Sequence, residues 1–106
     1  MYALDGIMLC CKEPNFRIHI VIAILTIVAG VMLKIERNDW ALLITTIGIV
    51  LITESINTSI EHLSNKVCPD QDPQIKATKD IAAGAVLLSA LLAIIMGIII
   101  FGKYIR

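Results

Sequence analysis

Three polar side chains share one stripe of an otherwise apolar segment. Glu54, Asn57 and Glu61 are spaced three and four residues apart. In an α-helix they lie on one face, with the two carboxylates about 10 Å apart along the axis. The surrounding residues, 48–60, are too apolar for a surface in contact with water. A carboxylate near the middle of a bilayer costs about 2.5–3.5 kcal/mol on insertion scales and usually faces inward to serve a function. The stripe is therefore a candidate functional site.

Composition indicates which solvent surrounds this stripe. Of the 106 residues, 58% are hydrophobic, above the roughly 45–50% of a soluble domain, so the bilayer is the expected solvent. Nine basic and nine acidic residues give a net charge of zero, and charge therefore provides no argument for a nucleic-acid partner. Cys10, Cys11 and Cys68 form no C-x-x-C motif. We interpret them as reduced thiols near a reducing cytoplasm, not as a disulfide or zinc site.

Charged residues divide the apolar sequence into helical segments. We expect an interfacial amphipathic helix at 2–13, transmembrane helices at about 16–34, 40–66 and 75–103, and a loop at 67–74. Pro69 and Pro73 end the second span, because each lacks a backbone donor and restricts the preceding residue. The whole chain, 1–106, is predicted to be a single all-α membrane domain. Since one copy has little surface to shield a polar stripe, we expect several copies to associate, with small residues on the third helix allowing close approach.

The remaining charged side chains of interest fall near one membrane face. Glu13, Glu61, Lys79 and Asp80 lie at a similar level, and Glu54 lies about two turns deeper. Phosphoryl transfer from a nucleotide needs a divalent cation on hard oxygen ligands, a positive charge against the phosphates and a group that takes the acceptor's proton. Glu13 and Glu61 are candidates for holding Mg²⁺, Lys79 for the phosphates, and Glu54 for the proton of a lipid alcohol.

Most of these residues also have a structural interpretation. Lys79 and Asp80 fit an interfacial anchor beside a surface carboxylate, and Asn57 fits a hydrogen bond between helices worth about 0.6 kcal/mol. Glu54 differs, because its depth argues against a purely structural role. The sequence contains no Walker A motif and no kinase glycine loop, so short motifs alone do not name the activity.

Longer motifs resemble a known family. The runs E-P-N-F-R-I-H at 13–19, E-S-I-N-T-S-I-E at 54–61 and K-D-I-A-A-G-A-V at 79–86 are similar to the signature of the prokaryotic diacylglycerol kinases, a family that includes undecaprenol kinases. The match covers nearly the whole chain and keeps the segment order. It implies an ATP-dependent, Mg²⁺-requiring lipid kinase that phosphorylates undecaprenol or diacylglycerol. It also implies a homotrimeric bundle, with one interfacial and three transmembrane helices per subunit and sites shared between neighbours.

The resemblance assigns roles to the matching positions. It implies that Glu54 is the catalytic acid or base and that Asn57 is a supporting amide. The residues implied in nucleotide binding are Tyr2, Glu13, Glu61, Asp70, Gln71, Asp72, Lys79 and Asp80, of which Glu13 and Glu61 hold the Mg²⁺. At 70–72 only backbone contacts are carried over, because the residue types differ from those of the best-known members. The residues implied beside the lipid are Asn15, Phe16, Arg17, His19 and Glu54.

Details of the resemblance bear on the acceptor and the nucleotide. The runs at 15–19 and 80–84 look closer to the undecaprenol-using members than to the diacylglycerol-using ones. Asn65 stands where many members carry an aspartate, and the basic N-terminal extension of longer members is missing. Both departures concern nucleotide affinity and leave the core residues in place.

Orientation follows from function and not from charge. Five basic residues lie on the side shared by the N-terminus and the loop at 67–74, and four lie on the other, a difference too small for the positive-inside rule. A site that uses ATP must face the cytoplasm. We therefore expect a multi-pass protein of the bacterial inner membrane, with this side inside.

Two rival interpretations belong to other functional classes. The first is a small ion- or proton-coupled transporter, in which Glu54 and Glu61 form a relay. Such a relay should continue to the opposite face, but beyond Glu54 the second span offers only threonines and the third offers only Ser89 beyond Asp80. The second rival is a noncatalytic assembly subunit, in which the acids and Lys79 gather by coincidence.

Overall fold

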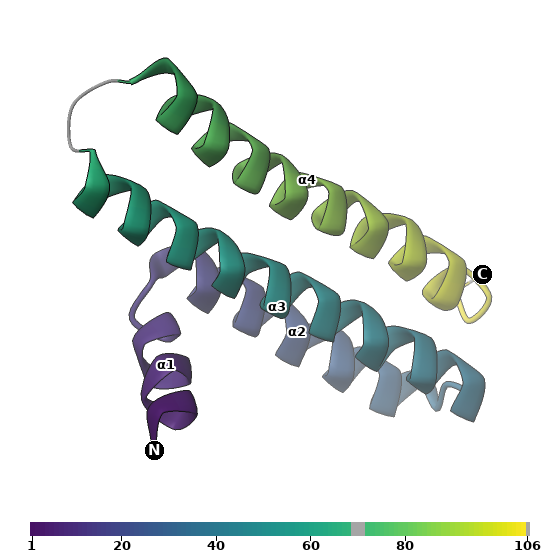
Figure 1. The fold of residues 1–106 in the computed structure, drawn as a ribbon. Helices are drawn as coiled ribbons and strands as arrows, with labels where there is room; N and C mark the ends of the chain where they lie inside the picture. The colour runs from purple at the N-terminus through teal and green to yellow at the C-terminus, as the bar shows by residue number, and fades with distance from the viewer. Residues whose placement is uncertain (69–71, 106) are drawn as a thin grey trace.

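The computed structural model describes residues 1–68 and 72–105 and consists of four α-helices. In chain order they are α1 (Tyr2–Cys10), α2 (Pro14–Leu33), α3 (Arg37–Val67) and α4 (Pro73–Gly102) (Figure 1). The described residues contain no strand. The all-α fold expected from the sequence is therefore confirmed.

Three of the helices are long and apolar enough to cross a bilayer. α2, α3 and α4 contain 20, 31 and 30 residues. At about 1.5 Å per residue, even the shortest reaches the roughly 30 Å of a hydrocarbon core. Their outer surfaces carry large apolar side chains, among them Ile22, Ile52 and Leu88, which are 51%, 61% and 70% exposed. Lipid is the solvent that such surfaces require, and the expected three candidate spans are present.

Two prolines mark where helices begin. Pro14 and Pro73 stand in the first turn of α2 and α4, where a missing N–H costs no hydrogen bond. The Asp72 carboxylate caps α4 by accepting hydrogen bonds from the next two free N–H groups, those of residues 74 and 75, at 2.8 and 3.2 Å. Before Pro14 the chain is extended at Glu13. As a result, α1 ends at Cys10 and not at residue 13.

α3 is the central element of the fold. α4 packs along most of it and α2 contacts it less extensively. Gly30 of α2 allows the second contact, because a Cβ atom there would lie 2.9 Å from the ring of Trp40 on α3. Beside this contact, Ile35, Leu43 and Ile100 form a small buried core. The bundle is thus tightly packed at the end where α2 turns into α3.

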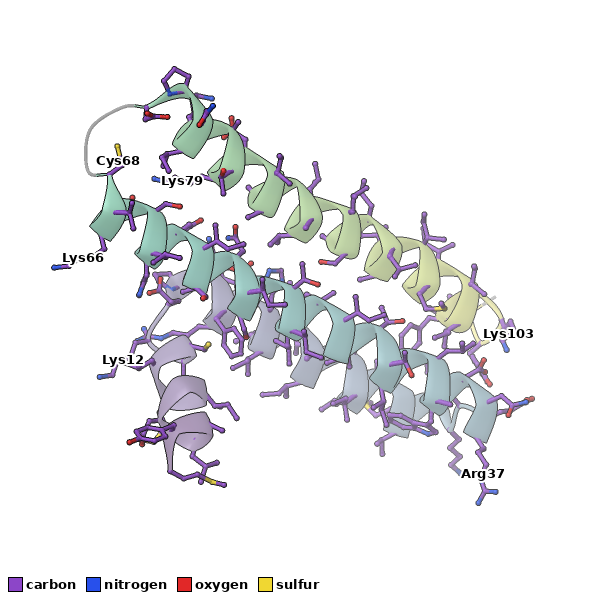
Figure 2. All side chains as sticks on the ribbon, viewed as in Figure 1. Lys12, Arg37, Lys66, Cys68, Lys79 and Lys103 are labelled. Carbon is purple, nitrogen blue, oxygen red and sulfur yellow. The ribbon has the colours of Figure 1, made fainter. Side chains whose placement is uncertain are left out.

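Polar groups also connect the start of α3 to the end of α4 at this end of the bundle. Lys103 Nζ donates to both Asp39 carboxylate oxygens at 2.8 and 2.9 Å, and the Tyr104 hydroxyl donates to Asp39 Oδ2 at 2.6 Å. The Tyr104 oxygen also accepts the Glu36 backbone N–H at 3.0 Å. Figure 2 shows Lys103 at this end with Arg37, and Lys12, Lys66 and Lys79 at the other. We call this group, Glu36, Asp39, Lys103 and Tyr104, the terminal clasp.

The terminal clasp should make stability depend on alkaline pH. The hydrogen bond to Asp39 raises the pKa of both Lys103 and Tyr104 above their ordinary values of 10.5 and 10.0. Their stabilisation is therefore complete below these ordinary values and is lost as the pH rises through the raised ones. We expect the thermal unfolding midpoint in detergent, followed by circular dichroism, to be level near pH 8 and to fall above about pH 10.

A Lys103→Met variant provides the control for this dependence. Without the ammonium, the buried Asp39 carboxylate loses its cationic partner, so the midpoint should be lower already near neutral pH. Its alkaline decline should also be shallower than that of the wild type. Parallel curves for the two proteins would contradict the assignment of the alkaline loss to the terminal clasp.

α3 turns one continuous stripe toward its neighbours. Its buried residues are Asp39, Leu43, Thr46, Val50, Glu54, Asn57 and Ser64. Successive members are three or four residues apart up to Asn57, and Ser64 follows seven residues later, which keeps them on one face of the helix. α1, in contrast, buries no residue and leaves the bundle near the start of α2 (Figure 1). Its position at a membrane interface remains a prediction.

Candidate functional site

Glu54 lies inside the bundle, close to a histidine of another helix. Its side chain is 4% exposed, and its Oε2 is 3.7 Å from Nε2 of His19 on α2, whose side chain is 19% exposed. The two side chains come from different helices, so this contact joins α2 to α3 at the level of Glu54. The deep acid therefore faces the inside of the bundle and has a polar neighbour there.

One turn along α3, Asn57 and Glu61 form the next part of the stripe. The Asn57 side-chain Nδ2 donates to Glu61 Oε1 at 3.1 Å, the i to i+4 contact that their spacing predicts. Asn57 Oδ1 is buried and has no hydrogen-bond partner among the described atoms. Leaving a buried acceptor unpaired costs about 1–3 kcal/mol. A donor on a bound molecule would remove that cost.

A third carboxylate reaches this region from the α1–α2 turn. Glu13 precedes α2 without capping it through its side chain, and its Oε1 lies 3.3 Å from Nε2 of His62 on α3. Glu61 belongs to the same region through its bond from Asn57, and Glu13 through its contact with His62, the residue next to Glu61. The structure thus brings the three acids that sequence reasoning selected, Glu13, Glu54 and Glu61, into one region, which we call the acidic cluster.

Lys79 of α4 contacts α3 close to this region. Its Nζ donates to Asn65 Oδ1 at 2.8 Å, and Figure 2 shows Lys79 directed into the space between α3 and α4. Asn65 is uncharged, so this bond fixes the ammonium group without neutralising it. Asp80 instead pairs with Lys76 at 2.7 Å, with both side chains more than 60% exposed. The Lys76–Asp80 pair contributes little stability.

Several of the predicted site residues stay outside the acidic cluster. Tyr2 on α1 is 96% exposed. Asn15 is exposed, and Arg17 is exposed with its Nε donating to the Cys11 carbonyl at 2.8 Å. Phe16 is buried at the start of α2. Asp72 is used as a helix cap, and Asp70 and Gln71 lie outside the described residues.

Two residues that contact the site, Asn65 and His62, are not among the site residues predicted from the sequence. The sequence identifies Asn65 only as a departure from the family pattern, although it follows Glu61 by four residues and so lies on the same stripe. His62 lies one residue off the stripe. Only the packing of the α1–α2 turn against α3 brings it to Glu13, and no local pattern indicates that contact.

The arrangement combines the parts that phosphoryl transfer requires. Hard carboxylate oxygens from Glu13 and Glu61 suit Mg²⁺, which is commonly bound by one or two carboxylates together with substrate phosphates. The described residues contain no group of three or more His, Cys, Asp or Glu side chains that could hold a metal alone. Two carboxylates and the oxygens of a bound phosphate together offer the hard ligands that such an ion takes.

The chain is similar to proteins of one family. Residues 1–101 match the family model described as prokaryotic diacylglycerol kinase. An undecaprenol kinase of Bacillus subtilis is 34% identical over 89 residues, which cover 84% of this chain and 72% of that protein. A diacylglycerol kinase of Synechocystis is 36% identical over 98 residues, 91% of this chain but only 56% of that protein. One from Helicobacter pylori is 30% identical over 104 residues, 97% of this chain and 78% of that protein.

Proposed function

The chain belongs to the prokaryotic diacylglycerol kinase family, and from this premise we propose that it is an ATP-dependent lipid kinase. It transfers the terminal phosphoryl group of ATP to the hydroxyl of a membrane lipid alcohol, undecaprenol or diacylglycerol. Its relatives are named as kinases of these two acceptors. The observation that carries the proposal is the inward-facing Glu54, which belongs to the acidic cluster with Glu13 and Glu61.

The reaction assigns a task to each side of the cluster. The lipid hydroxyl oxygen forms a bond to the γ-phosphorus of ATP, the bond between that phosphorus and the β–γ bridging oxygen breaks, and ADP leaves. Glu54 accepts the hydroxyl proton. Lys79, held by Asn65 at 2.8 Å, supplies positive charge to the phosphate oxygens. The Asn57 carbonyl oxygen, which has no described partner, accepts a hydrogen bond from the bound substrate.

Glu13 and Glu61 are the residues we propose to hold Mg²⁺. When bound with the nucleotide, the ion neutralises charge that develops on the phosphate oxygens. Glu13 lies in the α1–α2 turn, and its contact with His62 places it beside the part of α3 that carries Glu61. In the proposal this end of the site lies at the membrane surface, where a soluble nucleotide has access. Glu54 lies deeper, where a lipid alcohol arrives laterally.

Location and assembly form part of the same proposal. The site belongs at the cytoplasmic face of the bacterial inner membrane, because ATP is there, and α1 lies along that interface. The nucleotide contacts of Tyr2, Asp80 and the 70–72 stretch belong to the proposal too. The Tyr2 side chain is 96% exposed in a single chain. This exposure supports a homotrimer in which neighbouring subunits complete each site.

A transporter receives less support. Between Glu54 and Asp39, the buried face of α3 carries Thr46 as its only polar side chain, and that hydroxyl donates to the Leu42 carbonyl of its own helix at 2.7 Å. A proton relay would need further titratable groups along this stretch. The polar path ends halfway, as a kinase site near one membrane face requires.

A direct assay tests the proposal. The purified protein in lipid nanodiscs is incubated with Mg²⁺, γ-labelled ATP and either undecaprenol or diacylglycerol, and labelled lipid is measured by chromatography. We expect transfer of label to at least one of the two alcohols. Absence of transfer to both, from protein shown to be folded, would leave a noncatalytic subunit as the better interpretation.

A further inference from the structure

Lys79 and Asn65 form a bridge between α4 and α3 near the acidic cluster. The Lys79 ammonium donates to Asn65 Oδ1 at 2.8 Å, and Asn65 lies about one helical turn beyond Glu61 on α3. Among the described residues, no carboxylate lies within ion-pair distance of Lys79, and the adjacent Asp80 pairs with Lys76 instead. The bridge therefore holds the ammonium group in place and leaves its charge available.

The bridge also leaves hydrogen-bond donors unused. An ammonium group can only donate, so the Asn65 atom that faces it must be the carbonyl oxygen. The Asn65 amide nitrogen then keeps both of its hydrogens, and none of the described residues accepts a hydrogen bond from it. Further hydrogens remain on Lys79 Nζ. The two side chains thus present a positive charge together with several N–H donors, a combination that binds anions.

Exposure and position indicate which anion fits the bridge. Asn65 is exposed and Lys79 is half-buried, so a water-soluble ligand has access to both. Glu61, one of the two proposed Mg²⁺ ligands, lies about one turn from Asn65 on the same helix. Mg²⁺ commonly binds carboxylates and the phosphate oxygens of a nucleotide together. Phosphates held by an ion at Glu61 therefore lie within reach of the bridge.

We propose that Asn65 is a nucleotide-binding residue that also positions Lys79. Its carbonyl oxygen holds the Lys79 ammonium toward the terminal phosphates of ATP without neutralising it, and its amide N–H groups donate to the same phosphates. The inference deepens the proposed kinase function and rests on it for the identity of the anion. An aspartate at this position would pair with Lys79 and place a negative charge beside the phosphates, so the neutral amide sets how tightly this chain binds ATP.

Asn65→Asp provides the test, because it keeps the shape of the side chain and can still accept the bond from Lys79. The new carboxylate repels phosphate oxygens and partly neutralises the ammonium group. We expect KM for ATP to rise about fivefold or more and kcat to change by less than about twofold. The melting temperature should not fall, since an exposed ion pair joins two helices at least as well as a neutral hydrogen bond. A purely structural bridge would therefore leave KM unchanged in this variant.

Two further variants separate the added charge from the lost bridge. Asn65→Ala removes the bridge and the amide donors without adding a charge, so its KM for ATP should lie between those of the wild type and Asn65→Asp. Asn38→Asp is the matched control, because it makes the same change on an exposed residue near the other end of α3, and its KM should equal that of the wild type. A KM in Asn65→Asp within about twofold of the wild type, or no higher than in Asn65→Ala, would overturn the inference.

A binding measurement separates the inference from catalysis. Displacement of a fluorescent ATP analogue by ATP or by AMP is measured with Mg²⁺ in nanodiscs, without a lipid alcohol. We expect Asn65→Asp to weaken ATP binding about fivefold or more and AMP binding by less than about twofold, because AMP lacks the terminal phosphates. Equal weakening of both nucleotides would contradict the proposed contact. If the wild type binds ATP but phosphorylates neither alcohol, the proposed function fails and the phosphate contact of Asn65 is retained.

Discussion

Glu54→Gln is expected to abolish phosphoryl transfer while the protein still inserts and assembles. Glutamine has nearly the size of glutamate, so packing around a side chain that is 4% exposed should survive. The amide cannot accept the proton of the lipid hydroxyl, and loss of a positioned general base typically costs about 10²–10⁴-fold in rate. The measurement is kcat with labelled ATP and saturating lipid alcohol in nanodiscs.

Glu36→Gln serves as the control for this variant. It removes the same charge at the opposite end of the bundle, where Glu36 precedes α3 and makes no capping bond through its side chain. We expect wild-type turnover from it. Matching size-exclusion profiles and melting curves for both variants would show that Glu54→Gln is folded. Near-normal turnover in folded Glu54→Gln would remove Glu54 from the mechanism.

The spanning helices were predictable because their signal is local. Apolar runs of about 20 residues between charges fix the presence of a membrane helix whatever its neighbours do. The ends were less predictable, because they depend on single capping events. Pro14 separates α1 from α2 earlier than the charge pattern suggested, and α3 already begins at Arg37, three residues before the expected start.

The acidic stripe was predictable for a related reason. Glu54, Asn57 and Glu61 are on one helix, so the helical period alone places them on one face, and the structure confirms that Glu54 and Asn57 on this face are buried. Contacts between helices have no such local signal. The approach of His62 to Glu13 joins residues 49 positions apart, and that of Lys103 to Asp39 joins residues 64 apart. Both contacts needed the structure.

Asp80 shows that a sequence motif can identify a position without predicting the direction of its side chain. The resemblance assigned Lys79 and Asp80 together, as neighbours in a nucleotide site. Successive residues of a helix point about 100° apart, and here Lys79 turns to Asn65 of α3 while Asp80 pairs with Lys76 on the exposed side. A role for Asp80 in nucleotide binding therefore requires a second subunit or a ligand that reaches around α4.

Glu61→Gln is expected to raise the Mg²⁺ concentration needed for half-maximal activity by about tenfold or more, since even outer-shell changes at metal sites cost about 10–100-fold in affinity or activity. The substitution tests charge with little structural change. Asn57 Nδ2 donates to Glu61 Oε1 at 3.1 Å, and a glutamine side-chain oxygen can accept the same bond. The measurement is the dependence of initial rate on Mg²⁺ at fixed ATP and lipid. Unchanged metal dependence would count against Glu61 as a ligand.

Combining this change with Glu13→Gln tests whether the two carboxylates act on one ion. Residues that hold the same ion are coupled, so the double variant should lose less than the sum of the two single losses, expressed as free energies. Glu13 also contacts His62 at 3.3 Å. His62→Gln alone is therefore measured too, and we expect its Mg²⁺ dependence to stay close to that of the wild type. Strictly additive losses would place Glu13 and Glu61 on separate tasks, because two ligands of one cation cannot be removed independently.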